Sequence, residues 1–476
     1  MSDRGTLQGD LAQHFQAQRE RQLGELMRFL GIESISAQGT HADDMERAAG
    51  FVADDLRRSG MARVEVMRGR HHPFVLAEHV VDPALPTVLI YGHYDVQPPD
   101  PLPLWHSAPF APEVREGRIY ARGVSDDKGP LFIALKAVEA LFATRGALPV
   151  NVRFLVEGEE EIGSLHLGPF VEAHQDRLQA DLVLSADGAM WRPTEPSLTL
   201  AAKGLCGLEV HLVTANQDLH SGRHGGGVPN ALHALVELLA GLHAPDGSVA
   251  VPGFYDRVLE LTPAERAEIA ALDFDEDAYR RSLGMSELVG EAGYGTLERQ
   301  WCRPTLELNG MGGGYQGEGG KTVVPCEAVA KLTCRLVPDQ QPAEVQELVA
   351  REIRRRCPPW ARVEVRPEGG LGRWYRMPPD HPALEIAAGV LREVTGKAPV
   401  RVRMGGTEPC AEVFQRVLGV STLFYSFSTA DEQYHAPNEF FRLERFDQGL
   451  MAWALLLSRL GELSRAAITG SKEADA

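Results

Sequence analysis

The chain of 476 residues has few cysteines, no long hydrophobic run and no excess of basic residues. Its six cysteines form no Cys-x-x-Cys pair, and none has a histidine at zinc-finger spacing. We therefore expect buried, reduced thiols rather than a disulfide framework or a structural zinc site. The longest apolar runs, such as residues 452–457, are far shorter than the roughly 20 residues that cross a bilayer. No basic segment followed by an apolar one is visible at the N-terminus, so we expect a cytoplasmic protein.

Acidic residues outnumber basic residues, 66 to 48, and the formal net charge is −18. A surface of this sign repels nucleic acid and anionic membranes, so we expect neither as a partner. The hydrophobic fraction of 44% and the charged fraction of 24% are typical of globular proteins. A chain of this length exceeds what one hydrophobic core usually serves, which favours two domains.

Predicted strands and helices alternate along much of the chain. Apolar, β-branched segments predict strands, and segments with apolar residues three or four apart predict helices. The strands are expected at 74–80, 87–91, 150–156, 181–185, 400–403 and 422–426, and the helices at 11–32, 43–58, 131–142, 165–173, 382–395 and 443–463. This order is typical of an α/β fold, here a three-layer catalytic domain with a largely parallel mixed sheet.

The pattern changes after about Lys203, where residues 207–214 alternate in the manner of a half-exposed strand. We expect strands at 207–214, 330–336 and 363–365, helices at 230–242 and 343–355, and a glycine-rich stretch at 310–320 that is too flexible to be core. The sequence thus predicts a catalytic domain formed by residues 1–205 and 383–476, with an inserted α+β domain at 206–382.

Metal-ligand residue types follow several of the predicted strands. His93, Glu160, Glu161 and Asp187 each come shortly after a strand, and the carboxyl ends of parallel strands share one edge of a sheet. Asp126 and His435 lie in polar loops and complete a set with these four. Two imidazoles and three carboxylates suit two divalent ions that share a bridging carboxylate, and a carboxylate left free of metal can act as a general base.

Each of these motifs also has an ordinary structural explanation. A histidine two residues before an aspartate, as in His93-Tyr94-Asp95, is more often part of a polar loop. Two aspartates beside a lysine usually form an exposed turn, and a run such as residues 159–161 is commonly a solvated helix start. The residues alone leave open which glutamate of this run would bind metal.

Other residues resemble groups that contact a substrate. Arg335 has the geometry to bind a carboxylate with two hydrogen bonds, although it equally suits the surface of a strand. His220 lies in Asp-Leu-His-Ser-Gly, and Gly406 and Thr407 end a Gly-Gly-Thr segment.

Taken together, these motifs resemble the aminoacylase/carboxypeptidase-G type of di-zinc metallopeptidase, and within it the cytosolic nonspecific dipeptidase and carnosinase branch. The resemblance covers nearly the whole chain. The motifs that carry it are Tyr-Gly-His-x-Asp-Val-Gln-Pro (91–98), Arg-Gly-x-x-Asp-Asp-Lys-Gly-Pro (122–130), Glu-Gly-x-Glu-Glu-x-Gly-Ser (157–164), Asp-Leu-His-Ser-Gly (218–222), Lys-Thr-Val-Val-Pro (321–325), Arg-Leu-Val-Pro (335–338) and His-Ala-Pro-Asn-Glu (435–439).

The resemblance implies a role for each matching residue. It implies that Asp126 bridges two divalent cations, with zinc as the first choice and manganese or cobalt as alternatives. The remaining ligands would be His93 and Asp187 for one ion, and Glu161 and His435 for the other.

The same resemblance makes Glu160 the general base and Asp95 the partner that orients His93. It also implies a homodimer in which the inserted domain is both lid and interface, so that His220 acts in the partner's active site. Thr322, Arg335, Thr407 and Gly406 would contact the substrate.

The expected function is metal-dependent hydrolysis of dipeptides or short peptides. An N-acyl-amino-acid deacylase with the same chemistry is the alternative, and a non-catalytic binding protein of the same fold is a more remote one. The chain departs from the dipeptidase branch at Glu159, Gly188 and Thr407, where relatives often carry an apolar residue, asparagine and serine. These departures leave the substrate preference open.

Overall fold

The computed structural model describes residues 2–469, which fall into two compact units. Within these residues, unit 1 consists of the segments up to Leu200, Met377–Val402 and from Pro409 onward. Unit 2 consists of Ala201–Arg376 and Arg403–Glu408. The boundaries expected at 205/206 and 382/383 lie five and six residues from these divisions, and the short return of the chain to unit 2 at 403–408 was not expected.

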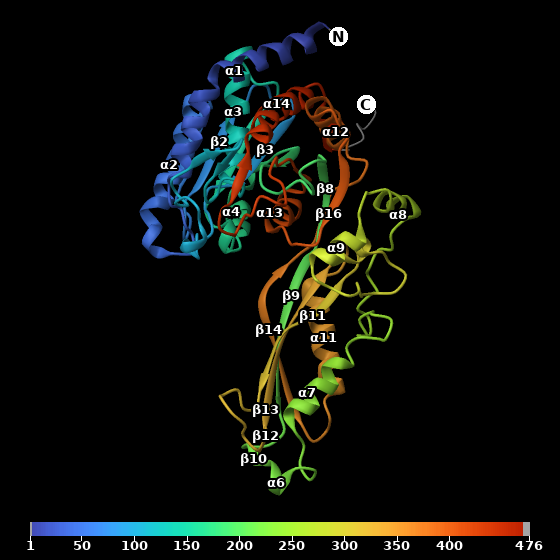
Figure 1. Ribbon diagram of the computed structural model, residues 1–476. Coiled ribbons are helices and arrows are strands. Elements are labelled where there is room, and N and C mark those ends of the chain that lie inside the picture. Colours follow the sequence, from blue (N-terminus) through green and yellow to red (C-terminus); the bar gives the residue numbers. More distant parts are fainter. Residues whose placement is uncertain (1, 470–476) are drawn as a thin grey trace. The chain divides into compact units, whose positions relative to one another are not determined.

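Unit 1 is built around a six-stranded mixed sheet (Figure 1). In spatial order its strands are β1 (Arg63–Met67), β2 (Phe74–His79), β6 (Asn151–Glu157), β3 (Thr87–His93), β7 (Leu182–Ser185) and β17 (Thr422–Phe424). The pairs β6–β3, β3–β7 and β7–β17 are parallel, whereas β1–β2 and β2–β6 are antiparallel. The expected α/β class with a largely parallel mixed sheet is confirmed.

Helices cover both faces of this sheet. Successive side chains of a strand point to opposite faces. On β3, the ring of Tyr91 packs against Phe414, whereas a Cβ at Gly92 would meet Leu131 of helix α3 (Lys128–Arg145) at 3.1 Å. Coverage of both faces explains why β3 is almost entirely apolar instead of alternating. The helices of unit 1 are α1 (Ser2–Leu30), α2 (Ala42–Ser59), α3 (Lys128–Arg145), α4 (Leu167–Ala173), α5 (Gln175–Leu178), α12 (Pro382–Thr395), α13 (Pro409–Val413), which continues into a π-helix at Phe414–Leu418, α14 (Leu443–Leu460) and α15 (Arg465–Thr469).

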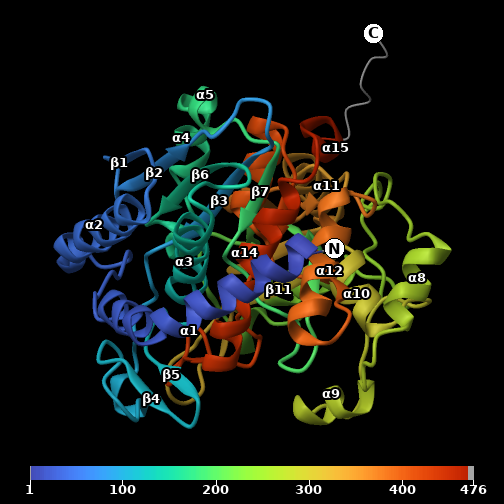
Figure 2. The same ribbon diagram turned by 90° about the horizontal axis from the view of Figure 1, so that it is seen from above.

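Helices α1, α3 and α14 pack against one another on the face that Leu131 marks (Figure 2). Helix α3 is buried on nearly all sides, which explains its lack of a polar face. Short elements complete the unit: 3₁₀ turns at Gly39–His41, Leu102–Leu104 and Glu160–Ile162, and a small sheet of β18 (Phe440–Arg442), β5 (Arg118–Tyr120) and β4 (Glu113–Arg115).

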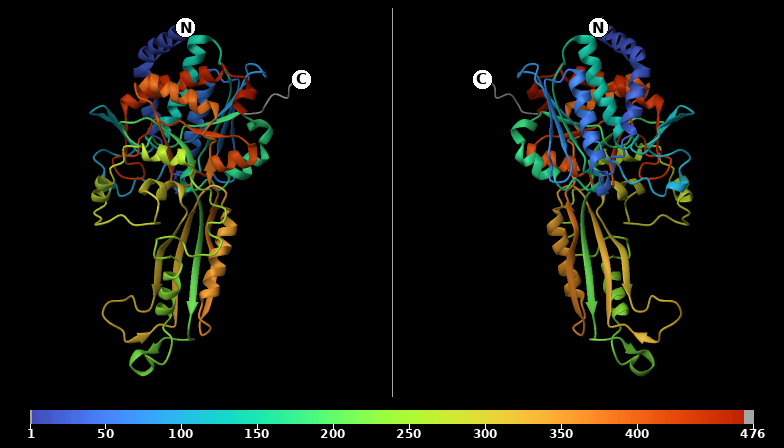
Figure 3. Two further views of the ribbon diagram at one scale, coloured as in Figure 1. Left: turned by 90° about the vertical axis from the view of Figure 1, so that its right-hand side faces the viewer. Right: turned by 90° about the vertical axis from the view of Figure 1, so that its left-hand side faces the viewer.

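Unit 2 has an antiparallel sheet with two helices on one face (Figures 1 and 3). Its strand order is β11 (Thr305–Gly313), β13 (Glu327–Leu336), β9 (Gly204–Val213) and β14 (Arg362–Gly372), and the helices are α7 (Ala231–Ala240) and α11 (Pro342–Arg356). Alternate residues of β9 and β13 enter the core beneath the helices, as expected for a sheet with one exposed face.

The rest of unit 2 is irregular or consists of short elements. These are β10 (Leu219–His220), α6 (Ser221–His224), β12 (Val323–Val324), α8 (Pro263–Ala270), α9 (Glu276–Ser282) and α10 (Thr296–Cys302). A further small sheet joins β15 (Tyr375–Arg376), β8 (Ser197–Ala202) and β16 (Val400–Met404), of which β8 and β16 begin in unit 1 segments and end in unit 2 segments. None of the residues 310–320 is buried, in agreement with the expectation that this stretch lies outside the core, although Gly310–Gly313 belong to β11 and pair with β13.

Two expectations based on composition can be compared with the described residues. None of the helices within 2–469 combines the length and apolar character that a bilayer crossing requires. The expectation that all six cysteines are buried is wrong for half of them. Cys206, Cys334 and Cys410 are buried, whereas Cys302, Cys326 and Cys357 are partly exposed.

Candidate metal centre

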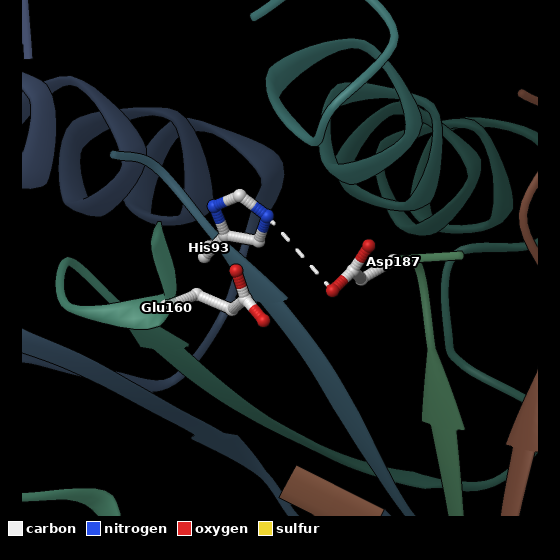
Figure 4. Close-up of side chains that lie close together, drawn as sticks. All are labelled: His93, Glu160 and Asp187. Atoms are coloured by element: carbon white, nitrogen blue, oxygen red, sulfur yellow. Dashed lines mark ion pairs between the residues drawn. The ribbon is translucent and has the colours of Figure 1, made fainter. Parts of the chain in front are cut away.

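Three neighbouring parallel strands of unit 1 end beside one another and carry polar residues at these ends. His93 is the last residue of β3 and pairs with Glu157, the last residue of β6. From Glu157 the chain enters the 3₁₀ turn that begins at Glu160, and Asp187 lies two residues beyond β7. Figure 4 shows the side chains of His93, Glu160 and Asp187 directed toward a common point, with His93 Nε2 3.9 Å from Asp187 Oδ2.

Asp126 lies between the two histidines of the candidate site. Its Oδ1 is 3.1 Å from Nε2 of His93, and its Oδ2 is 2.9 Å from Nε2 of His435. The same nitrogen of His435 is 3.0 Å from Oε2 of Glu161. One carboxylate thus presents an oxygen to each imidazole, which is the arrangement a bridging ligand requires.

Asp95 joins the first histidine to the glutamate turn. Its buried carboxylate lies 3.3 Å from Nδ1 of His93. It also accepts hydrogen bonds from the backbone N–H groups of Glu160 and Glu161, at 3.3 and 3.1 Å. Gln97, which sequence reasoning missed, donates its side-chain N–H to Glu161 Oε2 at 2.9 Å. These contacts fix both glutamates relative to the imidazole.

The ligand atoms form two groups, each with atoms within 4.8 Å of one another. One consists of His93, Glu160 and Asp187, and the other of Asp126, Glu161 and His435. Small rotations of such side chains bring their atoms to the roughly 2.0–2.2 Å at which nitrogen and oxygen bind zinc. The geometry therefore accommodates two cations. Asp126 belongs to the second group and also contacts His93 of the first.

The charges of these groups are not balanced without cations. Burial, together with repulsion between neighbouring carboxylates, raises the pKa of Asp187 to about 6 and that of Glu161 to about 7. The same causes raise the pKa of Glu160 well above its usual value. Buried carboxylates are disfavoured in their charged form unless a positive charge is near, and a divalent cation supplies that charge.

The two histidines respond to the same excess of negative charge. Hydrogen bonds to Asp126 and Glu161 raise the pKa of His435 to about 10. Burial lowers the pKa of His93, but its contacts with Asp126 and Asp95 outweigh burial and raise it well above the usual range. Burial likewise opposes the low pKa of Asp126, which the two imidazoles nevertheless maintain. These side chains thus favour bound positive charge, and the residues fit a pair of metal ions.

Glu159, the first acid of the glutamate run, has contacts of its own. Its side chain is buried, with one oxygen 3.1 Å from the backbone nitrogen of His72 and the other 2.7 Å from Nδ1 of His166. Glu159 thus ties the turn that carries Glu160 to two neighbouring segments. The negative charge of Glu159 therefore faces His72 and His166. The sequence alone did not predict these two contacts.

Replacing Glu159 with leucine should destabilise the metal-free protein by about 1–3 kcal/mol, because the buried N–H of His72 loses its acceptor. Urea unfolding of the metal-free protein measures this change. Glu172→Leu is the control, since Glu172 is a half-exposed partner of Arg416 and should contribute about 0–1 kcal/mol. Equal free energies of unfolding for the two variants would contradict the assignment.

The expected substrate-contacting residues belong to unit 2 and form two pairs. Arg335 donates a hydrogen bond to Oγ1 of Thr407 at 2.9 Å, and Gly406 accepts one from the backbone of Lys203. At the other end of the sheet, the backbone oxygen of Thr322 accepts from Ser221 N, directly after His220. The structure therefore brings Arg335 together with Thr407, and His220 together with Thr322.

An α/β sheet at whose carboxyl edge two histidines and several largely buried carboxylates meet defines a site for metal-assisted hydrolysis. Residues 89–459 match the family described as peptidase family M20/M25/M40, and the chain belongs to this family. It is 30% identical to the Cys-Gly metallodipeptidase dug1 of Schizosaccharomyces pombe over 92% of this chain and 95% of the relative. It is also 30% identical to the human Beta-Ala-His dipeptidase, over 92% of this chain and 90% of that protein.

Solved structures agree with this assignment. The M20 family metallo-carboxypeptidase Sso-CP2 from Sulfolobus solfataricus has a TM-score of 0.80 and 32% identity, covering 93% of this chain and 99% of its own. Human carnosine dipeptidase 1 has a TM-score of 0.77 and 29% identity, covering 96% and 99%. The chain is therefore a hydrolase of the metallopeptidase type, and the remote alternative of a non-catalytic binding protein loses its basis.

Proposed function

We propose that the protein hydrolyses the peptide bond of dipeptides with the help of two divalent cations. The observation that carries this proposal is the position of Asp126, whose two oxygens lie 3.1 and 2.9 Å from the two imidazoles within a cluster of further carboxylates. Two of the most similar relatives are named as dipeptidases that act on Cys-Gly and Beta-Ala-His, which supports this substrate class.

His93 and Asp187 would hold one ion, Glu161 and His435 the other, and Asp126 both. When bound, the ions supply Lewis-acid activation of water and of the scissile carbonyl. Mixed imidazole and carboxylate sites accept zinc, manganese or cobalt, and zinc is our first choice. Asp126 would be shared by both ions, and Glu160 would be the carboxylate left free of metal to act as the base.

Glu160 then acts as the general base. It takes a proton from the attacking water and delivers that proton to the departing amine nitrogen. Asp95 holds the ring of His93 in place through Nδ1, leaving Nε2 directed at the centre. In unit 2, Arg335 would pair with the free carboxylate of the substrate while Thr407 orients the guanidinium.

The distances within unit 2 support a homodimer. Residues Glu327 and Arg335 lie at the two ends of strand β13, eight residues and therefore about 26 Å apart. Strand β10, which ends at His220, and strand β12, which follows Thr322, lie beyond the Glu327 end of β13 (Figure 1), whereas Thr407 accepts a hydrogen bond from Arg335. A dipeptide spans only about 7 Å, so these two pairs from one chain cannot contact the same substrate. We infer that His220 and Thr322 serve the site of a second copy.

Two inactive variants test this arrangement. Glu160→Gln removes the base. His220→Ala removes a group that stabilises the oxyanion, and we expect this change to reduce kcat by about 10²–10³-fold. Co-expression with different tags yields the heterodimer, in which one site keeps both groups. Its activity should be about half that of the wild-type dimer, because one of two symmetric sites is intact. Activity no higher than in either homodimeric variant would contradict action in trans.

A substrate panel tests the reaction itself. Dipeptides should be hydrolysed in the presence of Zn²⁺ or Mn²⁺, and chelation should abolish turnover. Preferential hydrolysis of acetyl- or succinyl-amino acids would instead favour the deacylase. Release of C-terminal residues from longer peptides would favour a carboxypeptidase, the second candidate, because Sso-CP2 is named as a metallo-carboxypeptidase at 32% identity. No turnover of any of these substrates would refute the proposal.

A further inference from the structure

A fully buried carboxylate, Glu439, holds the loop that carries Asp126. One of its oxygens accepts hydrogen bonds from the guanidinium of Arg122 at 2.7 Å and from the backbone N–H of Gly123 at 2.8 Å. The other accepts from the backbone N–H groups of Ser125 and Asp126, at 2.8 and 3.2 Å. All four donors lie within residues 122–126, so this one carboxylate binds the whole loop.

A second buried carboxylate, Glu432, contacts the same loop from the same segment. Its Oε2 accepts from the hydroxyl of Ser125 at 2.7 Å and from the backbone N–H of Thr429 at 3.0 Å. Its Oε1 pairs with Arg442 at 3.0 Å. The hydroxyl of Ser428 donates to the backbone oxygen of Ser125. The loop is therefore held through both the side chain and the backbone of Ser125.

The segment that provides these contacts also carries His435, which lies between Glu432 and Glu439 in the chain. We propose that Glu432 and Glu439 are positioning residues that fix the separation of Asp126 and His435, and thereby determine how tightly the centre retains its metal ions. The inference rests on the proposed function only in treating the centre as a metal site. Neither glutamate is itself near enough to be counted among the ligand groups.

The chemistry of Glu439 allows a precise test. A glutamine at this position keeps the size of the side chain but provides one acceptor oxygen, and its NH₂ group would face backbone donors. Two of the four hydrogen bonds should then be lost, and the loop should shift. Replacing a residue that supports a metal ligand typically weakens metal binding by about 10–100-fold, and we expect this range for Glu439→Gln.

Asp181→Asn is the matched control. Asp181 is also a buried carboxylate, paired with Arg465 and accepting a backbone hydrogen bond from Thr87 N. It lies just before β7, at the opposite end of this strand from Asp187. The control therefore weakens another ion pair of a buried carboxylate in unit 1, with a more exposed arginine, without touching the Asp126 loop.

The experiment measures Zn²⁺ affinity by competition with a chromophoric chelator, without substrate, and the unfolding of the metal-free proteins. We expect Glu439→Gln to bind Zn²⁺ about 10–100-fold more weakly while Asp181→Asn binds as the wild type does. Unchanged affinity in folded Glu439→Gln, or an equal loss in Asp181→Asn, would overturn the proposal.

If Glu439→Gln does not fold, the Zn²⁺ affinity of Ser125→Ala tests the proposal instead. This variant removes only the hydroxyl that Glu432 accepts from, and a loss of affinity of about threefold or more is expected. Unchanged affinity would overturn the proposal. Wild-type protein that binds Zn²⁺ but hydrolyses no dipeptide would refute the proposed function and leave this test intact.

Discussion

Glu160→Gln is expected to reduce kcat by about 10²–10⁴-fold while the protein retains its metal ions, because the amide cannot accept a proton from water. The side chain keeps its size, and the backbone N–H of residue 160 still donates to Asp95. Metal content by elemental analysis and dipeptide hydrolysis at saturating substrate measure the two effects separately.

Glu161→Gln is the matched control, one residue further along the same turn. Its side chain contacts His435 at 3.0 Å, so its loss should reduce metal content as well as activity. The two neighbours should therefore differ in metal retention although both lose turnover. Glu160→Gln protein that remains active, or that loses metal as readily as Glu161→Gln, would contradict the assignment of the base.

Asp126→Ala is expected to have the largest effect on metal binding, because within residues 2–469 Asp126 is the one side chain that contacts both His93 and His435. Other ligand variants remove one contact from one group, whereas this one removes an oxygen from each. We expect less than one ion per chain at metal concentrations that fill both sites of the wild type, and no measurable turnover. Equilibrium dialysis followed by elemental analysis gives the stoichiometry.

Loss of the fold must be distinguished from loss of the ligand. Asp126 has pairing partners among the histidines, so circular dichroism and unfolding of the metal-free variant should accompany the dialysis. Glu161→Gln again provides the comparison, with a loss expected mainly in the group that contains His435. Two tightly bound ions in Asp126→Ala would show that this carboxylate is not a bridge.

The central strands were predictable because both of their faces are covered. Coverage gives β3 and β7 a continuous apolar run and β6 a run that only Arg153 interrupts, and a polar residue marks the end of each strand. Since parallel strands end at one edge, the proximity of His93, Glu160 and Asp187 followed from the order of the elements alone. Asp126 and His435 required the family motifs, because both lie in loops.

Other features could not be predicted because their cause lies in tertiary contacts. Strand β11 contains glycines that weaken its own preference for a strand, and pairing with β13 compensates for them. The role of Glu159 depends on His72 and His166, which lie in separate segments. Glu439 was visible in the His-Ala-Pro-Asn-Glu motif, but only the fold shows that it accepts four hydrogen bonds from residues 122–126.

The division of unit 1 into separate stretches of sequence has a consequence for biosynthesis. Strand β17 pairs with β7, yet more than 230 residues separate Ser185 from Thr422, and all of unit 2 is translated between them. While the ribosome makes that part, the outer edge of β7 has no partner, and exposed strand edges invite association with other chains. The nascent polypeptide must therefore keep this edge protected until Thr422–Phe424 has been made and pairs with β7.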